Sequence, residues 1–267
     1  MGRTRGTWNT KGTWFAGAAL AAVLALTGYA VLSGGDEDSD APSKAGSSAS
    51  ASASASAGPS ASYAPPEDWT EPTSWSALPR GERTDERGSA VGYPQSTEGA
   101  VAMMAAANTT VIDAETSNVD EQLRIYQSYI GTADQSSQNA EQIELAAIQS
   151  DKALAKQVGV GAGQPLPPGA YVRSTVVGYQ VIKTSDTEVS AWLLARVVQK
   201  NGEMEKEKGS YTRTLAGAQW EGGDWKLTAD ATARAQQDVQ GTAQPAMAAP
   251  GDAEFNQAGW TAVRQAS

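Results

Sequence analysis

Residues 188–227 read EVSAWLLARVVQKNGEMEKEKGSYTRTLAGAQWEGGDWKL, and this stretch decides the fold. From Glu188 to Gln199, apolar side chains recur at every second position, as they do in a β-strand with one buried face. Asn201-Gly202 is a strong two-residue hairpin signal, and it predicts a tight turn that sets Lys200 opposite Glu203. The apolar face of the first strand consists of Val189, Ala191, Leu193, Ala195 and Val197.

The glycine pair Gly222-Gly223 predicts a second turn. A turn centred on this pair ends a returning strand from Tyr211 to Trp220 and brings Trp220 opposite Trp225. Directly opposed aromatic side chains stabilise antiparallel pairing. Together with a Val- and Tyr-rich strand from Tyr171 to Lys183, these segments predict a four-stranded antiparallel meander.

Upstream of the strands, apolar residues recur at helical spacing. After a cap at Ser96 or Thr97, one apolar face from Ala100 to Ala114 predicts a first helix. A second helix is predicted around Leu123 to Ile130, and a third from Ser137 to Val158. About three helices that precede an antiparallel sheet make an α+β domain.

The N-terminal part of the chain predicts a membrane anchor. Residues 13–32 carry no charge over a length that spans a bilayer as a helix. Basic side chains lie in residues 1–12 and acidic ones follow the apolar run, so the positive-inside rule places the N-terminus in the cytoplasm and the rest outside. The alternative is a cleaved signal peptide, with Gly28-Tyr29-Ala30 as the cleavage site.

The remaining segments differ in composition. Residues 33–66 alternate Ala and Ser, which bury little, so we expect a disordered tether. Residues 67–93 are expected to be an extended segment, rich in Trp and Pro, that lies on the domain or binds a partner. The α+β domain is expected at residues 94–230, followed by a flexible tail at residues 231–267.

Charge and missing residue types exclude several function classes. The net charge is −10 without a basic stripe, which disfavours nucleic-acid binding. The chain has neither His nor Cys, and therefore lacks the commonest general base, metal ligand and nucleophile pairs. Carboxylate pairs such as Asp113 with Glu115 lie in no recognisable catalytic motif. We therefore expect no enzyme, no cofactor and no metal site.

The candidate interaction residues are two tryptophan pairs and one methionine pair. The tryptophans suit stacking against a sugar or an aromatic ligand, and core or lid packing is the alternative. The methionines suit a pocket or an interface, and a simple core face is the alternative. These candidates are Trp69, Trp75, Met103, Met104, Trp220 and Trp225.

Three short motifs carry a family resemblance. They are Trp75 followed by Leu78-Pro79, then Gly-Tyr-Pro-x-Ser-x-x-Gly-Ala at residues 92–100, then Gly-Asp-Trp at residues 223–225. This pattern resembles a group of actinobacterial single-pass membrane proteins, often associated with mobile-element or conjugation loci.

The layout over residues 92–230 carries a second resemblance. An anchor, a tether, N-terminal helices and a meander resemble the inner-membrane scaffold subunits of type IV secretion systems and the TcpC-like conjugation proteins. This resemblance implies a cone-shaped, nuclear-transport-factor-like fold with a curved sheet. It also implies an extracytoplasmic scaffold or accessory subunit of a conjugation or secretion complex, which contacts other envelope proteins and copies of itself.

The alternative function is an extracytoplasmic domain that binds a small ligand or the cell wall in a pocket between helices and sheet. A third hypothesis is an enzyme that uses an Asp or a Glu in the same pocket.

Overall fold

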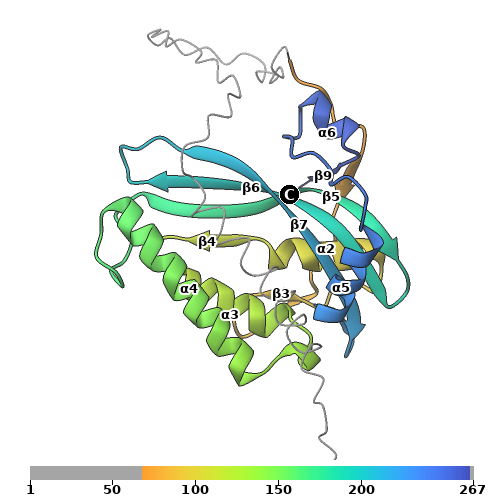
Figure 1. Ribbon diagram of the computed structural model, residues 1–267, viewed down its shortest axis with the longest axis horizontal. Helices are drawn as coiled ribbons and strands as arrows, with labels where there is room; N and C mark the ends of the chain where they lie inside the picture. The colour runs from red at the N-terminus through yellow and green to blue at the C-terminus, as the bar shows by residue number, and fades with distance from the viewer. Residues whose placement is uncertain (1–67, 265–267) are drawn as a thin grey trace, which may run out of the picture.

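The computed structural model of the protein describes residues 68–264 (Figure 1). The basic segment at residues 1–12, the predicted membrane anchor at residues 13–32 and the tether at residues 33–66 lie outside the described residues. Within residues 68–264, no helix is both long and apolar enough to cross a membrane.

The described residues form an α+β domain, as predicted. The helices are α2 (Thr97–Ala107), α3 (Asn118–Tyr129), the 3-10 helix η1 (Thr132–Asp134), α4 (Ser137–Val158), α5 (Ala229–Asp238) and α6 (Ala253–Gln257). The strands are β1 (Trp75–Ala77), β2 (Arg83–Thr84), β3 (Ala90–Val91), β4 (Thr110–Ile112), β5 (Ala170–Thr184), β6 (Glu188–Asn201), β7 (Lys208–Glu221), β8 (Asp224–Leu227) and β9 (Thr261–Arg264).

The predicted meander is present as β5 to β8, which pair antiparallel in chain order. The sheet is larger than the four strands predicted. It has seven strands in the order β1-β9-β5-β6-β7-β8, with β4 also paired to β5. Strands β2 and β3 form a separate two-stranded sheet. The segment predicted as extended, residues 67–93, therefore supplies three short strands.

The prediction of a flexible tail at residues 231–267 is wrong for the described part of that segment. Helix α5 continues to Asp238, and α6 and β9 follow. Strand β9 joins the sheet between β1 and β5. The Ala- and Gln-rich composition of this segment predicted no packing, but its two large side chains, Phe255 and Trp260, are fully buried.

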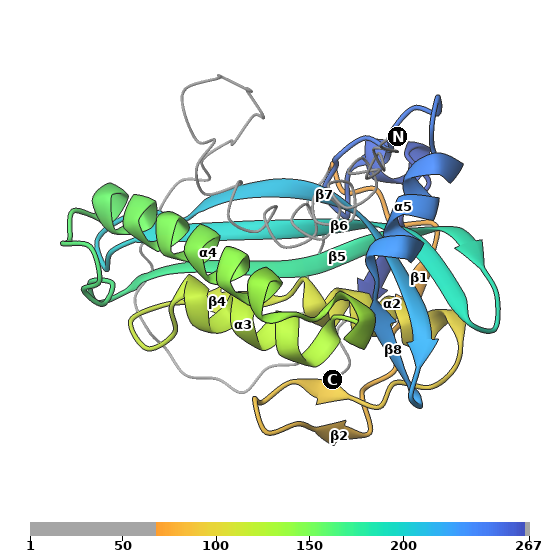
Figure 2. The ribbon, with the colours of Figure 1, turned by 60° about the horizontal axis from the view of Figure 1, so that its bottom comes forward.

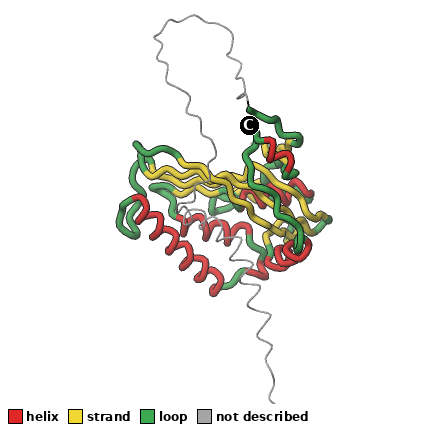
Figure 3. The backbone as a smooth tube through the Cα atoms, turned by 45° about the horizontal axis from the view of Figure 1, so that its top comes forward, coloured by secondary structure: helices red, strands yellow, loops and turns green. Residues whose placement is uncertain are grey.

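The sheet has a helical layer on one face and the C-terminal segment on part of the other (Figure 3). On the inner face, the predicted apolar positions of β6 from Val189 to Ala195 are buried in one cluster with Met103 and Met104 of α2 and with side chains of α3. On the outer face, Trp192 and Leu194 pack with Phe255 and Trp260. Strand β6 is thus buried on both faces over this half of its length.

The first helix is shorter than predicted. Helix α2 begins after the N-cap Ser96 and ends at Ala107, so the predicted continuation to Ala114 is wrong. Asn108 caps the helix and donates from Nδ2 to the Met104 carbonyl at 2.8 Å. The β-branched run Thr110–Ile112 then pairs with β5, because strand pairing suits these side chains better than a helix does. By contrast, α4 has the predicted bounds.

The Asn201-Gly202 hairpin prediction is also wrong. Strand β6 continues through Asn201, and Gln199 pairs with Lys208, so Lys200 does not face Glu203. Residues 203–207 are all exposed. Pairing of this charged segment would bury no apolar side chains and would therefore add little stability. The β6–β7 pairing begins only at Lys208.

The Gly222-Gly223 turn is confirmed. Trp220 lies opposite Trp225 in the β7–β8 register. Their ring centroids are 5.4 Å apart with an interplanar angle of 71°. This is the edge-to-face arrangement that aromatic pairs prefer.

Two of the three short motifs meet in space. The buried Asp224 carboxylate accepts the backbone N–H groups of Gly92 at 2.9 Å and Tyr93 at 3.0 Å. The indole Nε1 of Trp225 donates to the Pro94 carbonyl at 2.9 Å. The Gly-Tyr-Pro and Gly-Asp-Trp motifs therefore form one clamp that fixes the entry to α2 against the β7–β8 hairpin.

The rest of the Gly-Tyr-Pro motif, up to residue 100, builds the start of α2. Ser96 Oγ accepts the Gly99 backbone N–H at 3.0 Å, which satisfies one of the free donors of the first turn. A Cβ on Gly99 would lie 1.9 Å from the Pro94 carbonyl oxygen, so only glycine fits there. The motif residues thus have structural roles.

Candidate functional site

Trp69 and Trp75 share one carboxylate. The indole Nε1 of Trp69 donates to Glu71 at 3.0 Å, and that of Trp75 donates to the other oxygen at 2.9 Å. These two hydrogen bonds hold the pKa of Glu71 below its usual value. The Arg264 guanidinium lies 4.9 Å from the Trp75 ring centroid. Both indoles are therefore engaged within the protein.

The same segment is fastened to the C-terminal part of the chain. The Thr70 N–H donates to the Gly251 carbonyl at 2.7 Å. The Asn256 side chain accepts from the Thr73 N–H at 2.9 Å and donates to the Glu71 carbonyl at 3.0 Å. Residues 69–75 thus form a strap across residues 251–256, and this geometry fits the lid-packing alternative.

The second tryptophan pair and the methionines lie in the core. Trp225 is fully buried and Trp220 is half-buried beside it, at the opposite end of the strand order from Trp75. Met103 and Met104 have no exposed surface. In this structure neither methionine reaches solvent, so the geometry fits their core-face alternative.

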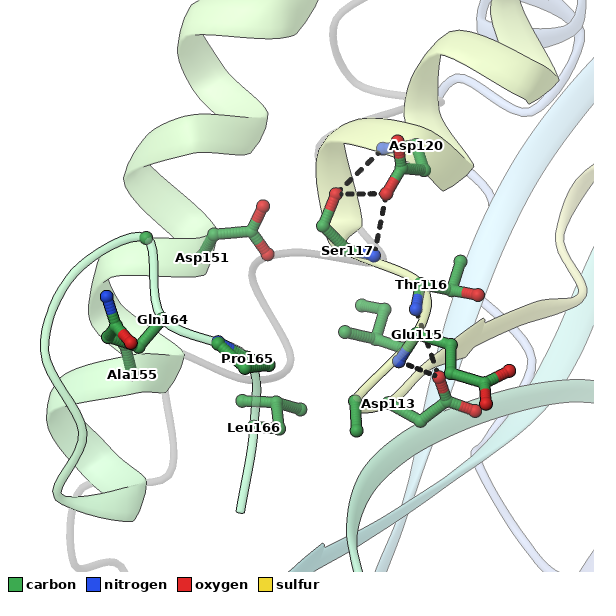
Figure 4. A pocket seen from close by; sticks show the side chains of 13 residues that line it. Asp113, Glu115, Thr116, Ser117, Asp120, Asp151, Ala155, Gln164, Pro165 and Leu166 are labelled. Atoms are coloured by element: carbon green, nitrogen blue, oxygen red, sulfur yellow. Dashed lines mark hydrogen bonds between the residues drawn. The ribbon is translucent and has the colours of Figure 1, made fainter. Parts of the chain in front are cut away.

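A polar pocket of about 190 Å³ lies between the β4–α3 connection, α4 and the loop that follows α4 (Figure 4). Its acidic residues hold backbone amides. Asp113 accepts from the Glu115 and Thr116 N–H groups at 2.9 and 3.0 Å. Ser117 and Asp120 form a reciprocal capping box at the start of α3.

Asp151 reaches this pocket from α4. Its carboxylate accepts the N–H groups of Asn118 at 2.9 Å and Val119 at 3.2 Å, the first residues of α3. Burial raises the pKa of Asp151, while these two hydrogen bonds act to lower it. Within residues 68–264, no group of three or more Asp or Glu side chains is placed to hold a metal ion. Asp120 and Asp151 thus hold the start of α3, and Asp113 holds the turn before it.

A second hollow, of about 490 Å³, lies between the outer face of the sheet and the segment after α5. Arg213 extends over the Trp192 ring, with 5.6 Å from its guanidinium to the ring centroid. The same guanidinium donates to the Pro245 carbonyl and to the Gln244 side chain. Arg213 therefore fastens the C-terminal segment to the sheet.

The most distinctive surface is the half of the outer face that none of residues 68–264 covers, where β5, β6 and β7 extend beyond the C-terminal segment (Figure 2). We call it the bare sheet face. It contains a shallow hollow of about 270 Å³. The hollow is lined by Tyr171, Arg173, Thr175, Val177, Arg196, Val198 and Glu207.

Register explains why these side chains share a face. Arg173 pairs with Val198 and Thr175 pairs with Arg196, and directly paired residues lie on the same side of a sheet. The intervening residues Val172 and Val197 point to the inner face and are buried with Leu154 of α4.

The bare sheet face carries two accessible arginines. The Arg173 guanidinium lies 4.2 Å from the Tyr171 ring centroid, and the Tyr171 hydroxyl donates to Glu207. Within residues 68–264, neither Arg173 nor Arg196 lies within salt-bridge distance of a carboxylate. Both are exposed. An arginine and tyrosine surface of this kind can accept carboxylates and pack against apolar groups.

The sequence-based candidates omitted this surface. The signal was present: polar or basic residues alternate with buried ones along residues 171–175, while residues 190–195 are apolar or small at nearly every position. An unbroken apolar run indicates a strand buried on both faces. The switch from that run to alternation marks where the cover on the outer face ends.

Comparison of the chain with protein-family models, curated proteins and solved structures finds no match.

Proposed function

We propose that this protein is a membrane-anchored extracytoplasmic scaffold or accessory subunit of a conjugation- or secretion-type envelope complex. It acts through protein–protein contacts and has no enzymatic activity. The anchor is residues 13–32, which hold it in the cell membrane as a single-pass protein with a cytoplasmic N-terminus. Its envelope partners dock on the bare sheet face. The finer fold assignment, a cone-shaped nuclear-transport-factor-like domain, belongs to the same proposal.

The observation that carries this proposal is the composition of the bare sheet face. Arginine and tyrosine are enriched in the energetically dominant parts of protein interfaces. Here Arg173 and Arg196 are displayed with Tyr171 and Val198 on a rigid antiparallel sheet. The rigidity limits the entropy cost of ordering the surface on binding. The partner side that fits such a surface is acidic with apolar patches.

The packing inside the domain favours this function over the ligand-pocket alternative. An apolar pocket between α2 and the sheet would need space in the core. Met103, Met104 and Leu193 fill that region, and each is at most 1% exposed. The carboxylates nearest a hollow, such as Asp113 and Asp151, are hydrogen-bonded to backbone amides. These features support a binding role over a catalytic one.

The test compares two double variants of the full-length chain in its own membranes. Arg173→Ala with Arg196→Ala removes two positive charges from the bare sheet face. Lys152→Ala with Lys156→Ala removes the same charge from exposed positions of α4, on the other side of the sheet. After chemical cross-linking in intact membranes, cross-linked proteins are identified by mass spectrometry.

We expect the arginine double variant to lose cross-links to transfer-machinery proteins by about tenfold or more, because interface arginines contribute on the order of 2 kcal/mol each. The lysine double variant should keep them. Equal yields from both variants, or a protein that cross-links to no envelope protein, would contradict the proposal.

A further inference from the structure

Strand β7 has a long free edge. Strand β6 pairs with residues 208–219 of β7, whereas β8 pairs only with residues 218–221 on the other side. At Gly217 the start of α5 closes this edge, because the Gly217 N–H donates to Thr232 Oγ1 and its carbonyl accepts the Thr228 N–H. Residues 208–216 therefore have one strand neighbour among the described residues. Figure 2 shows β7 along the border of the sheet.

The other borders of this sheet are short. Strands β1 and β4 have three residues each, and β8 has four. Native proteins shorten, bend or cover edge strands because an exposed ladder pairs with other chains. Prolines and β-bulges also protect edge strands. The free part of β7 contains no proline, and its register with β6 has no bulge. Such an edge is suited to pairing.

The hydrogen bonds of Gly217 show which backbone N–H and C=O groups of β7 point away from β6. Gly217 points its N–H and C=O away from β6, toward α5. In a regular antiparallel ladder these directions alternate with period two. The N–H and C=O groups that face outward on the free edge are therefore those of Gly209, Tyr211, Arg213 and Leu215. These are eight backbone groups in line.

We propose that the free edge of β7 pairs antiparallel with the same edge of a second copy of this chain, with a twofold axis at Thr212. This inference rests on the proposed scaffold function and names one of its partners. The free edge runs from Lys208 to Ala216, so its midpoint is Thr212. A twofold axis there uses the whole edge and joins the two sheets into one. The two bare sheet faces then form one continuous surface.

The side chains are complementary in this register. On the outer face, Tyr211 lies opposite Arg213 of the second copy, and the symmetry produces this pair twice. The Arg213 stem can pack beside the Tyr211 ring while its guanidinium keeps its contacts with Trp192 and Pro245. On the inner face, Thr212 lies opposite itself and Ser210 opposite Thr214. No two like charges face each other directly, because Lys208 lies opposite Ala216.

A second copy also fits the proposed anchoring. Two chains held in one membrane by residues 13–32 meet at a high effective concentration, which favours a contact too weak to persist in dilute solution. A twofold, isologous contact closes on itself, because the β7 edges of both copies are used in it. An edge that paired with an unrelated partner would not need this self-complementary sequence.

The experiment uses single cysteines in the full-length chain, which has none of its own. Residue Thr212 sits in a non-hydrogen-bonded pair on the axis, where opposed Cα atoms are about 4.5 Å apart. That separation is within the range of about 4.4–6.8 Å that a disulfide bridges. Thr212→Cys in membranes should therefore form disulfide-linked dimers under mild oxidation. Non-reducing electrophoresis reads the yield.

The register supplies the controls. Ser210→Cys alone should form at most a tenth of that dimer yield, because residue 210 lies four positions from residue 210 of the second copy, roughly 13 Å along the strand. Co-expressed Ser210→Cys and Thr214→Cys chains should cross-link to each other. The reduced variants should keep the melting temperature of the parent chain, which shows that each is folded.

Dimers at Thr212→Cys and in the mixed pair, with little at Ser210→Cys alone, support the pairing. No dimer at any position, or equal dimers at all of them, overturns it. The proposed function fails separately: equal cross-link yields from the arginine and lysine double variants, or no cross-links to any envelope protein, would contradict that function whether or not the β7 edges pair.

Discussion

The two halves of the outer sheet face differ although they belong to the same three strands. In one half, Trp192 and Leu194 are buried under Phe255 and Trp260 of the C-terminal segment. In the other, Arg173 and Arg196 are exposed beside the partly buried Tyr171, on β5 and β6 of the same sheet. Within residues 68–264, the C-terminal segment covers the half that is apolar and not the half that bears the arginines. This difference motivates the proposal that a partner docks on the bare sheet face.

The largest expected contrast between the halves is in stability. Phe255→Ala should lower the free energy of unfolding by roughly 3–5 kcal/mol, because the ring is fully buried and would leave a cavity against Gly178. Tyr171 lines the hollow of the bare sheet face and is only half-buried. Tyr171→Ala should therefore lower the free energy of unfolding by no more than about 1 kcal/mol. Urea denaturation of both variants measures this difference. Similar losses would mean that the bare face is also a packed interior surface.

A glycine pair sharpens the same contrast. Gly217→Ala would place a Cβ 2.3 Å from the Ala231 backbone carbon, so α5 has to shift, at a cost of about 1–3 kcal/mol. Gly209→Ala meets nothing closer than the Arg196 Nε at 4.0 Å. It should be neutral or stabilising by up to about 1 kcal/mol, because alanine narrows the unfolded ensemble. Thermal melts of the two variants give the comparison.

The arginines of the bare face should matter for binding and not for folding. Arg173→Ala with Arg196→Ala should change the free energy of unfolding by less than about 0.5 kcal/mol, since neither guanidinium forms a salt bridge within the described residues. Guanidinium-chloride denaturation checks this value. A loss above 2 kcal/mol, on the order of a buried-site effect, would assign the pair a structural role.

The smallest expected effect is a pH dependence of stability, which arises from Glu71 in the strap at residues 69–75. Because the folded-state pKa of Glu71 lies below its usual value, the unfolded chain binds the proton more readily. Its contribution to stability is therefore present above the ordinary carboxylate range and is lost as the pH falls through the lowered pKa. Tryptophan fluorescence should report loosening of Trp69 and Trp75 on acidification.

Glu71→Ala is the control for that titration. At neutral pH the variant should already have the tryptophan fluorescence that the parent chain reaches at acidic pH. Acidification through the lowered pKa of Glu71 should not change its fluorescence further. An unchanged titration in the variant would place the acid-sensitive group elsewhere.

Local patterns predicted the parts of the fold that local physics decides. The bounds of α4 and the Trp220–Trp225 pair follow from helical periodicity and a two-glycine turn. The end of α2 and the loop at residues 202–207 were misplaced, because β4 pairs with the distant β5, and because exposed charges outweighed the Asn-Gly preference. Those outcomes depend on long-range pairing that a short window of sequence does not contain.

The cover of the outer face was hidden for a similar reason. The tail around Phe255 and Trp260 is surrounded by Ala, Gln and Gly, which predict little structure by themselves. Its partner surface, Trp192 and Leu194, lies some 60 residues earlier. The bare sheet face could have been found by comparing the two alternating sets of each strand, because one set changes from apolar to basic along β6.

The most direct test of the central claim is site-specific photo-crosslinking of the full-length chain in intact membranes. One photoreactive side chain replaces Val198 on the bare sheet face, and a matched one replaces the exposed Gln149 on α4. We expect discrete adducts with envelope proteins from position 198 and none from position 149. Adducts from position 149 with none from position 198 would contradict it.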